Sequence, residues 1–326
     1  MEKTILGNSQ EEKRRKIISK KLIFESAPFI GLIGLIIIYF GISGGNISLY
    51  NFEIIINQSV ILTVVAIGAV FIFSFGSFDI SLGASMAVSG MIGVMAYNRT
   101  ESFAIMLIVC LTTGVLVGIV NSLLSAIFNL PAFVSTIAML SILTSLVDLI
   151  LDGNTNISLL GSTMEIDNLS VKMVILVLFF SVAFYLFNKT EVGRKNKFLG
   201  SNPVAASQTG ISIVKQTIYS FCFSGLGVGL AAFITILRAP TLSKSTGGSI
   251  GMDVLIAIVF GGMSVSGGAR SKIGAAVVGS LSITVLNQVL LVLGASFGMT
   301  QLIKGVMFLV VVFVASLNYR SKLLPR

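Results

Sequence analysis

Ten apolar segments follow one another along this chain, and they decide what it can fold into. A helix needs about 20 apolar residues to cross a membrane, and fewer where neighbouring helices assist it. The third and the eighth segments are short, which predicts broken or partial helices near 76–97 and 251–268. The sequence therefore predicts an all-α polytopic membrane protein with about ten transmembrane helices. The segments lie at about 28–43, 54–75, 81–97, 103–126, 132–151, 170–187, 216–238, 251–265, 272–295 and 300–317.

The distribution of charge predicts how these helices are oriented. Only 11% of the 326 residues are charged, whereas 55% are hydrophobic. Lys and Arg gather before the first segment, in the loop 188–215 and after the last segment. Because basic residues next to membrane spans favour the cytoplasmic side, we expect both termini and this loop in the cytoplasm. No small-residue cleavage site follows the basic N-terminal segment, which indicates an uncleaved anchor.

This pattern predicts one membrane domain and no separate soluble domain. The domain covers residues 28–318 and includes the cytoplasmic loop 188–215. A cytoplasmic segment, 1–27, precedes it, and a cytoplasmic tail, 319–326, follows it. We expect a multi-pass membrane protein, with lipid as its surroundings.

The chain lacks the residues that several classes of function require. The chain has no histidine and only two cysteines, which leaves almost no ligands for zinc or haem and excludes a histidine-dependent triad. No GxxxxGK[ST] spacing occurs, so the chain is not expected to bind ATP itself. The net charge of +9 lies at the ends of apolar segments, without the interleaved aromatic residues of a nucleic-acid site. We expect no metal, no cofactor, no nucleic-acid partner and no enzymatic activity.

The basic loop 188–215 contains a predicted short helix. Asn202 is a favourable N-cap, and Pro203 suits the first helical position because it has no N–H to leave unpaired. Gly210 can adopt the left-handed conformation that ends a helix. The sequence therefore predicts a rigid helix from Pro203 to about Thr209, which a soluble partner can use as a docking point.

Two polar breaks interrupt the apolar segments. The first, Ser74–Gly83, contains Asp79, and an ionised carboxylate at the bilayer centre costs about 2.5–3.5 kcal/mol. Two interpretations of Asp79 stay open: a broken backbone at membrane depth, or a cytoplasmic turn that caps the next helix. The second break, Gly261–Gly268, is a tight turn or a hinge of a substrate path, and we favour the turn.

Three further features of the spans carry predictions. Asn121 is an amide within a span, where contact between helices is favoured over contact with a ligand. Lys304 lies near the outer end of the last span and is expected to extend to the membrane interface. Two GxxxG spacings place glycines on one helix face, and we expect packing within the chain rather than a dimer contact. These glycines are Gly114, Gly118, Gly225 and Gly229.

Four motifs occur together and in order. Phe75–Gly83 resembles GGIDLSVG, with Asp79, Ser81 and Gly83 at matching positions. Asn121 and the stretch Leu130–Leu140, which contains Phe133, resemble N-G-x-L followed by P-x-F-[IV]-x-T-L. Gly193–Ile211 is similar to G-R followed by G-x-N-x-x-A-A-x-x-x-G-I, and Gly251–Gly268 is similar to ELDAIAAVVLGGTSLAGG. These are motifs of the permease subunits of ribose-type monosaccharide ABC importers, a family that includes galactose, xylose, arabinose and autoinducer-2 permeases.

The chain departs from the motifs of this family at Ser77, Phe78 and Ser122. These departures leave the resemblance to the family in place but leave the identity of the transported solute open. The resemblance implies a transport subunit with three kinds of protein partner: a cytoplasmic ATPase subunit, an extracytoplasmic sugar-binding protein and a second permease subunit, identical or related. The substrate pathway is expected at Asp79, Ser81, Gly83, Asn121, Phe133, Gly261 and Gly262. Coupling to the ATPase is expected at Gly200, Asn202, Pro203, Ala205, Ala206 and Gly210.

A second class of function remains open from the residues. Asp79 could serve as the proton or sodium site of an ion-coupled secondary transporter, since acids at membrane depth are typical of such proteins. A single acid without histidine makes a poor proton relay, and the helix in the loop 188–215 would then have no function. We therefore favour a permease that moves its substrate by alternating access, driven by a separate ATPase.

Overall fold

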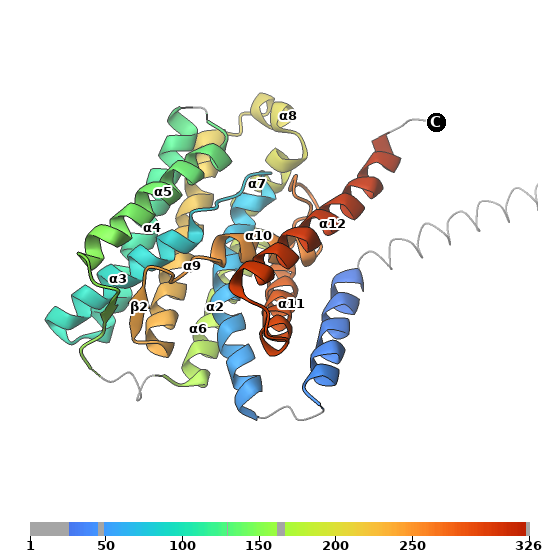
Figure 1. The fold of residues 1–326 in the computed structure, drawn as a ribbon. Coiled ribbons are helices and arrows are strands. Elements are labelled where there is room, and N and C mark those ends of the chain that lie inside the picture. Colours follow the sequence, from blue (N-terminus) through green and yellow to red (C-terminus); the bar gives the residue numbers. More distant parts are fainter. Residues whose placement is uncertain (1–25, 45–48, 129, 162–166, 324–326) are drawn as a thin grey trace, which may run out of the picture.

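The computed structural model describes residues 26–44, 49–128, 130–161 and 167–323, and side chains in α12 only as far as residue 313. Most of the predicted segment 1–27 and the last residues of the tail 319–326 lie outside the described residues. An apolar helix, Ser26–Ile42, comes first. It is followed by α2 (Leu49–Ser74), α3 (Leu82–Thr100), α4 (Phe103–Ile127), α5 (Ala132–Leu151), α6 (Leu169–Lys189), α7 (Glu191–Ser201), α8 (Pro203–Gln208), α9 (Ile213–Arg238), α10 (Ile250–Phe260), α11 (Ile273–Val292) and α12 (Phe297–Leu323) (Figure 1).

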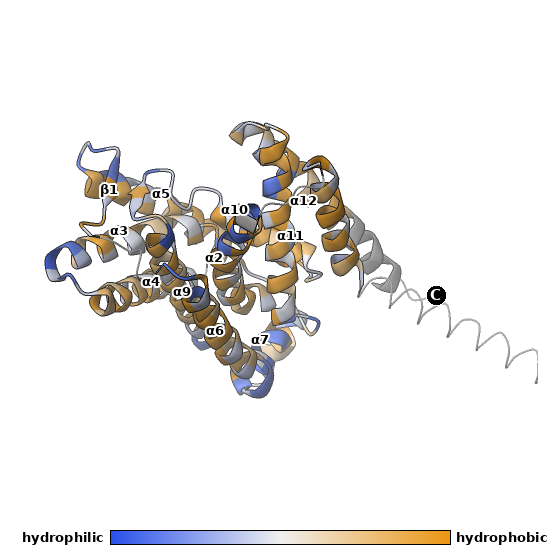
Figure 2. Cartoon of the chain, turned by 90° about the horizontal axis from the view of Figure 1, so that it is seen from below, coloured by the Kyte–Doolittle hydropathy of each residue, from blue (hydrophilic) through white to orange (hydrophobic). Residues whose placement is uncertain are grey.

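Each of the ten predicted apolar segments coincides with a helix. The third and eighth segments were short, which predicted broken or partial helices. Accordingly, α3 begins only after the non-helical break that contains Asp79, and α10 has only 11 residues. Figure 2 shows apolar residues along the helices and polar residues in the connections. The all-α membrane fold is thereby confirmed. Among the described residues, six helices are long and apolar enough to cross a membrane: Asn51–Ser74, Phe103–Ile127, Ala132–Leu151, Leu169–Lys189, Ile213–Arg238 and Ile273–Val292.

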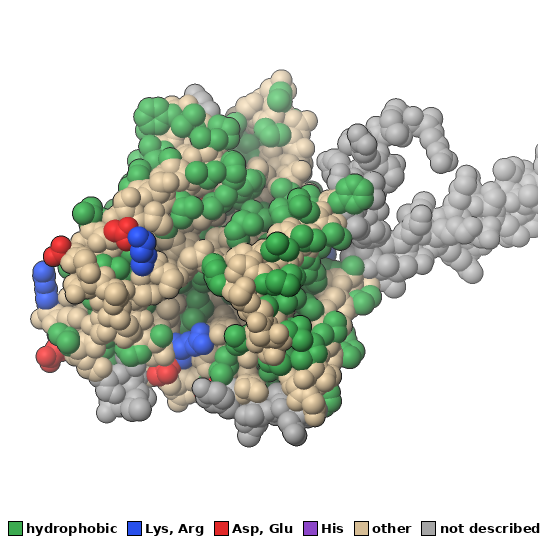
Figure 3. Space-filling view, viewed as in Figure 1, with side chains coloured by type: hydrophobic (Ala, Val, Ile, Leu, Met, Phe, Trp, Pro, Cys, Tyr) green, Lys and Arg blue, Asp and Glu red, His purple; other side chains and the backbone are tan. Residues whose placement is uncertain are grey.

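The surface of the helical bundle is apolar. Large hydrophobic side chains such as Leu149, Phe297 and Leu309 are between 68% and 75% exposed. Figure 3 shows hydrophobic side chains spread over the visible face, with the few charged side chains toward its lower left. Such a surface is stable only in contact with lipid or with other protein.

α4 and α9 pack with their backbones in close contact. A Cβ atom added at Gly114 would lie 2.4 Å from the carbonyl oxygen of Gly225, and one at Gly225 would lie 2.3 Å from that of Gly114. In the same way, a Cβ added at Gly118 would lie 2.4 Å from the Phe221 carbonyl oxygen, and one at Gly229 would lie 2.5 Å from that of Cys110. The two GxxxG faces therefore meet within the chain, which confirms the prediction of internal packing.

A short antiparallel ribbon joins two connections that lie far apart in the sequence. β1 (Asn156–Ser158) pairs with β2 (Thr241–Ser243), with Ile157 opposite Leu242. Asn98 of α3 holds this ribbon, because its side-chain amide donates to the Ser158 carbonyl and accepts from the Leu160 N–H, at 3.0 and 2.8 Å. The ribbon thus fixes the connection between α9 and α10 against the end of α3.

The opposite end of the bundle brings together α7, the end of α2 and the loop between α10 and α11. The Gly268 N–H donates to the Ser74 carbonyl at 2.9 Å, and a Cβ at Gly200 would lie 2.2 Å from the same oxygen. Figure 1 places α7 and α8 at this end. The predicted tight turn at Gly261–Gly268 is confirmed as a series of turns, with a φ angle of +66° at Gly267. This is the end that carries the basic loop 188–215.

Candidate functional site

Asp79 lies inside the protein, where a turn precedes α3. Its side chain is only 6% exposed. The Oδ1 atom accepts hydrogen bonds from the Ser81 N–H at 2.8 Å and the Ser81 hydroxyl at 2.6 Å. The carboxylate lies three residues before Leu82, close to the positive end of the α3 dipole. The break is therefore a turn that is buried within the protein, and the two interpretations of its depth in the membrane stay predictions.

Asn121 joins this turn to α4. Its side-chain Nδ2 donates to Asp79 Oδ2 at 3.2 Å and to the Ser81 hydroxyl at 2.9 Å. The residue is 1% exposed, and its Oδ1 atom has no partner among the described residues. Asn121 thus contacts the turn that leads into α3, within the protein, and its role in a substrate pathway stays a prediction.

The backbone of the break also packs tightly on the segment that leads into α10. A Cβ at Gly83 would lie 2.0 Å from the Gly247 carbonyl oxygen, and one at Gly251 would lie 2.5 Å from that of Ile80. The Ile80 N–H donates to the Thr136 hydroxyl of α5 at 3.4 Å. Glycine is required at position 83 because two backbones approach each other there.

A cavity of about 10 Å³ lies beside the Asp79 carboxylate. Its walls include Asn121 of α4 and Ser224 of α9 together with Ser85 of α3. The Ser224 hydroxyl, like Asn121 Oδ1, has no partner among the described residues. This volume is close to the least that holds one water molecule, so the cluster is closed to a sugar in this conformation.

The structure does not bring all predicted pathway residues together. Asp79, Ser81, Gly83 and Asn121 form one cluster. Phe133 lies beside the Phe78 ring, with the ring centroids 5.1 Å apart, and is itself 40% exposed. Gly261 and Gly262 lie apart at the other end of α10, about 15 Å beyond Gly251 at the rise of an α-helix. There a Cβ at Gly261 would lie 2.0 Å from the Ala275 carbonyl oxygen of α11.

The prediction for Lys304 was wrong. Its side chain is 2% exposed, and its ammonium group lies 2.6 Å from Asp253 Oδ1. A charge buried without an opposite charge is costly, so the pair forms instead of a contact with the membrane interface. The signal was present in the sequence, since an acid and a base each occurred within an apolar segment. Lys172 is a second buried cation of this kind, with Asp167 and Asn57 as its partners.

The predicted helix in the loop 188–215 is present as α8. Asn202 caps it by accepting the Ala205 N–H at 3.0 Å, Pro203 is its first residue, and Gly210 has a φ angle of +80°. Ala206 is fully buried, however, because this side of α8 faces the protein, and it cannot contact a partner in this conformation. Val204 is an exposed large hydrophobic residue of α8, at 67%.

Charged side chains surround α7, the helix that precedes α8. The Lys195 ammonium, 2.5 Å from the Glu191 carboxylate, donates a hydrogen bond that holds the pKa of that carboxyl below its ordinary value. Partial burial lowers the pKa of Lys197, which lies 4.4 Å from the centre of the Phe187 ring. These contacts give α7 a polar outer surface at the end of the bundle.

Among the described residues, no group of three or more acidic or cysteine side chains is placed to hold a metal ion. The polar cluster instead consists of one carboxylate, hydroxyls and an amide, together with the backbone groups that they bind. Such an arrangement holds a broken backbone in place.

Comparison with known proteins places the chain among membrane permeases. It is 28% identical to the ribose import permease protein of Haemophilus influenzae, over 90% of this chain and 93% of that protein. It is 26% identical to the ribose import permease protein of Escherichia coli, over 92% and 96% of the two chains. The fructose import permease protein of Rhizobium meliloti is 28% identical, over 89% and 84%. No solved structure matches the chain.

A family description matches residues 51–312, which include the Asp79 cluster, α7 and α8. The match covers most of the chain, and the relatives align over nearly their whole length. The chain belongs to the family described as "Branched-chain amino acid transport system / permease component".

Proposed function

We propose that this chain is the transmembrane permease subunit of an ATP-binding-cassette importer for a ribose-like monosaccharide or a related small solute. The observation that carries the proposal is the full-length similarity to proteins named as ribose and fructose import permeases. In this proposal ten helices span a bacterial inner membrane as one domain, residues 28–318, and both termini lie in the cytoplasm. ATP hydrolysis takes place in a separate subunit.

The arrangement of α7 and α8 supports a mechanism of alternating access. α8 holds an exposed apolar side chain, Val204, on the end of the bundle that carries the basic loop. A cytoplasmic ATPase subunit that binds α8 would move α7 with it. α7 contacts the end of α2, which leads directly into the break with Asp79. Movement of α8 can thereby widen or close the cavity beside Asp79.

The geometry of Asp79 favours this mechanism over an ion-coupled secondary transporter. The carboxylate already accepts hydrogen bonds from Ser81 and Asn121, so it serves to order the backbone. None of the similar proteins named above is described as ion-coupled. The secondary-transporter hypothesis therefore has no support beyond the presence of one buried acid.

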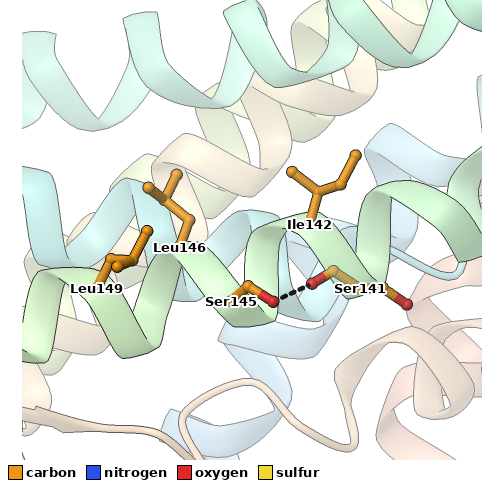
Figure 4. A pocket seen from close by; sticks show the side chains of 5 residues that line it. All are labelled: Ser141, Ile142, Ser145, Leu146 and Leu149. Atoms are coloured by element: carbon orange, nitrogen blue, oxygen red, sulfur yellow. Dashed lines mark hydrogen bonds between the residues drawn. The ribbon is translucent and has the colours of Figure 1, made fainter.

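A second permease subunit, identical or related, is part of the proposal, and α5 is the helix that we assign to it. α5 exposes the hydroxyls of Ser141, Thr144 and Ser145 along an apolar helix, although each is bonded to a carbonyl of its own helix. Figure 4 shows Ser141 and Ser145 beside a shallow hollow of about 460 Å³ on this face. Hydroxyl residues of this kind are typical of contacts between membrane helices.

The third proposed partner is an extracytoplasmic sugar-binding protein. It would deliver the solute at the end of the bundle opposite to α8.

The docking role of α8 predicts the effect of one substitution. Val204→Glu should abolish co-purification of the ATPase subunit proposed as the partner of this permease, because it places a charge in the apolar contact. The permease itself should remain folded, since Val204 is 67% exposed and contributes little to the core. The measurement is the amount of ATPase retained per permease. Native mass spectrometry of the same complex counts the permease subunits, and two copies are expected.

The matched control is Leu160→Glu, which changes an apolar residue of similar exposure, 72%, at the opposite end of the bundle. This variant should retain the ATPase. Equal ATPase binding by both variants would show that α8 is not the docking element.

A further inference from the structure

α7 contains a buried amide within an otherwise basic helix. Asn196 is fully buried, although both residues beside it in the sequence are lysines. Its Nδ2 atom donates to the Phe71 carbonyl oxygen of α2 at 3.1 Å and to the Ser220 hydroxyl of α9 at 2.8 Å. One side chain thus connects α7 to two membrane helices.

Both partners of Asn196 lead to the Asp79 cavity. Phe71 belongs to the last turn of α2, where its carbonyl also accepts the Ser74 hydroxyl at 2.7 Å, and the chain runs from there directly into the Asp79 break. Ser220 lies one turn before Ser224 on the same face of α9, and Ser224 lines the cavity beside Asp79. The amide therefore contacts the two elements that can carry a movement to the cavity.

The end of α7 is fixed in the same region by backbone contacts. A Cβ at Gly200 would lie 2.2 Å from the Ser74 carbonyl oxygen, so α7 touches the end of α2 there as well. The Ser201 hydroxyl accepts the Ala269 N–H at 3.0 Å, which adds the loop between α10 and α11. α8 begins two residues later, at Pro203. A displacement of α8 consequently reaches α2 and α9 through a helix that is held along its length.

We propose that Asn196 is a positioning residue that transmits the displacement of α8 to α2 and α9, and so couples ATP hydrolysis to transport. This role rests on the proposed function. A buried amide suits it because its two N–H groups bind both helices at once. Loss of these bonds takes from the Ser220 hydroxyl the amide donor that it accepts and leaves the Phe71 carbonyl with the Ser74 hydroxyl, at 2.7 Å, as its remaining side-chain donor. An apolar side chain of similar size would fill the space without joining the helices.

The experiment uses the full complex of permease, ATPase and binding protein in proteoliposomes, with labelled ribose as the probe. ATP hydrolysis and ribose uptake are measured together for Asn196→Leu. We expect the ATPase to bind and hydrolyse ATP as in the wild type, while uptake per ATP falls by roughly tenfold, the effect of losing buried hydrogen bonds. Asn156→Leu is the matched control, an exposed amide in β1 at the other end of the bundle, and should leave this ratio unchanged.

Ser220→Ala provides a second variant if Asn196→Leu does not fold. It removes one of the two hydrogen bonds, keeps the contact with Phe71, and should lower uptake per ATP to an intermediate value. Unchanged uptake per ATP in folded variants would overturn the role of Asn196, as would losses of hydrolysis and uptake in equal proportion. Absence of ATP-driven uptake by the wild-type complex would overturn the proposed function, and this role with it.

Discussion

Lys304→Met is expected to prevent the protein from reaching a stable folded state, and Asp253→Leu in the same chain is expected to restore it. The two side chains form a buried ion pair between α12 and α10, at 3% and 6% exposure. Removing one member of such a pair leaves a buried charge without compensation and costs about 3–5 kcal/mol, whereas replacing both by apolar residues is often neutral. The measurement is the fraction of protein that elutes as a single species in mild detergent, together with its thermal unfolding midpoint.

The control for this prediction is Lys195→Met. Lys195 forms an ion pair of similar length with Glu191, but both side chains are exposed, at 40% and 68%. Exposed pairs contribute about 0–1 kcal/mol, so this variant should behave as the wild type. A Lys304→Met variant as stable as the wild type would show that the ion pair does not hold α12 against α10.

Substitutions at Asp79 are expected to separate its hydrogen bonds from its charge. Asp79→Asn should retain much of the uptake, because the amide still accepts from Ser81 and Asn121 can turn its unpaired Oδ1 toward the new N–H groups. Asp79→Ala should lose uptake by roughly tenfold or more, since each buried donor left unpaired costs about 1–3 kcal/mol. Uptake of ribose by the complete complex is the measurement, normalised to the permease in the membrane.

Glu53→Ala, a change at an exposed acid of α2, controls for the loss of a negative charge and should leave uptake unchanged. Wild-type uptake by both Asp79 variants would mean that the residue is only part of a turn. Loss of uptake in both would show that the charge itself is required, which would revive the ion-coupled hypothesis.

Features set by neighbouring residues could be predicted from the sequence. The cap at Asn202, the proline at position 203 and the glycine at 210 act within a few residues of one another, and they correctly bounded α8. The apolar segments likewise gave the helices, because length and hydropathy are local properties. The break before α3 followed from the same kind of signal.

Features that depend on tertiary contacts could not be predicted in this way. The pairing of β1 with β2 joins two three-residue segments that are separated in the sequence by the four helices α6 to α9. Neither segment has a strand pattern of its own. The burial of Ala206 depends on which side of α8 faces the protein, which a six-residue helix does not reveal. The partner of Lys304 lies about 50 residues away in another helix, so only the presence of an opposite charge was visible, as expected for contacts set by packing.

The most direct test of the proposed function is the energy source for uptake. The permease is reconstituted in proteoliposomes with and without its ATPase and binding protein, and labelled ribose is the probe. We predict uptake only when the ATPase and internal ATP are present, and we predict that it persists after a protonophore and a sodium ionophore collapse both ion gradients. Uptake by the permease alone, driven by a proton or sodium gradient, would contradict the assignment as a subunit of an ATP-driven importer.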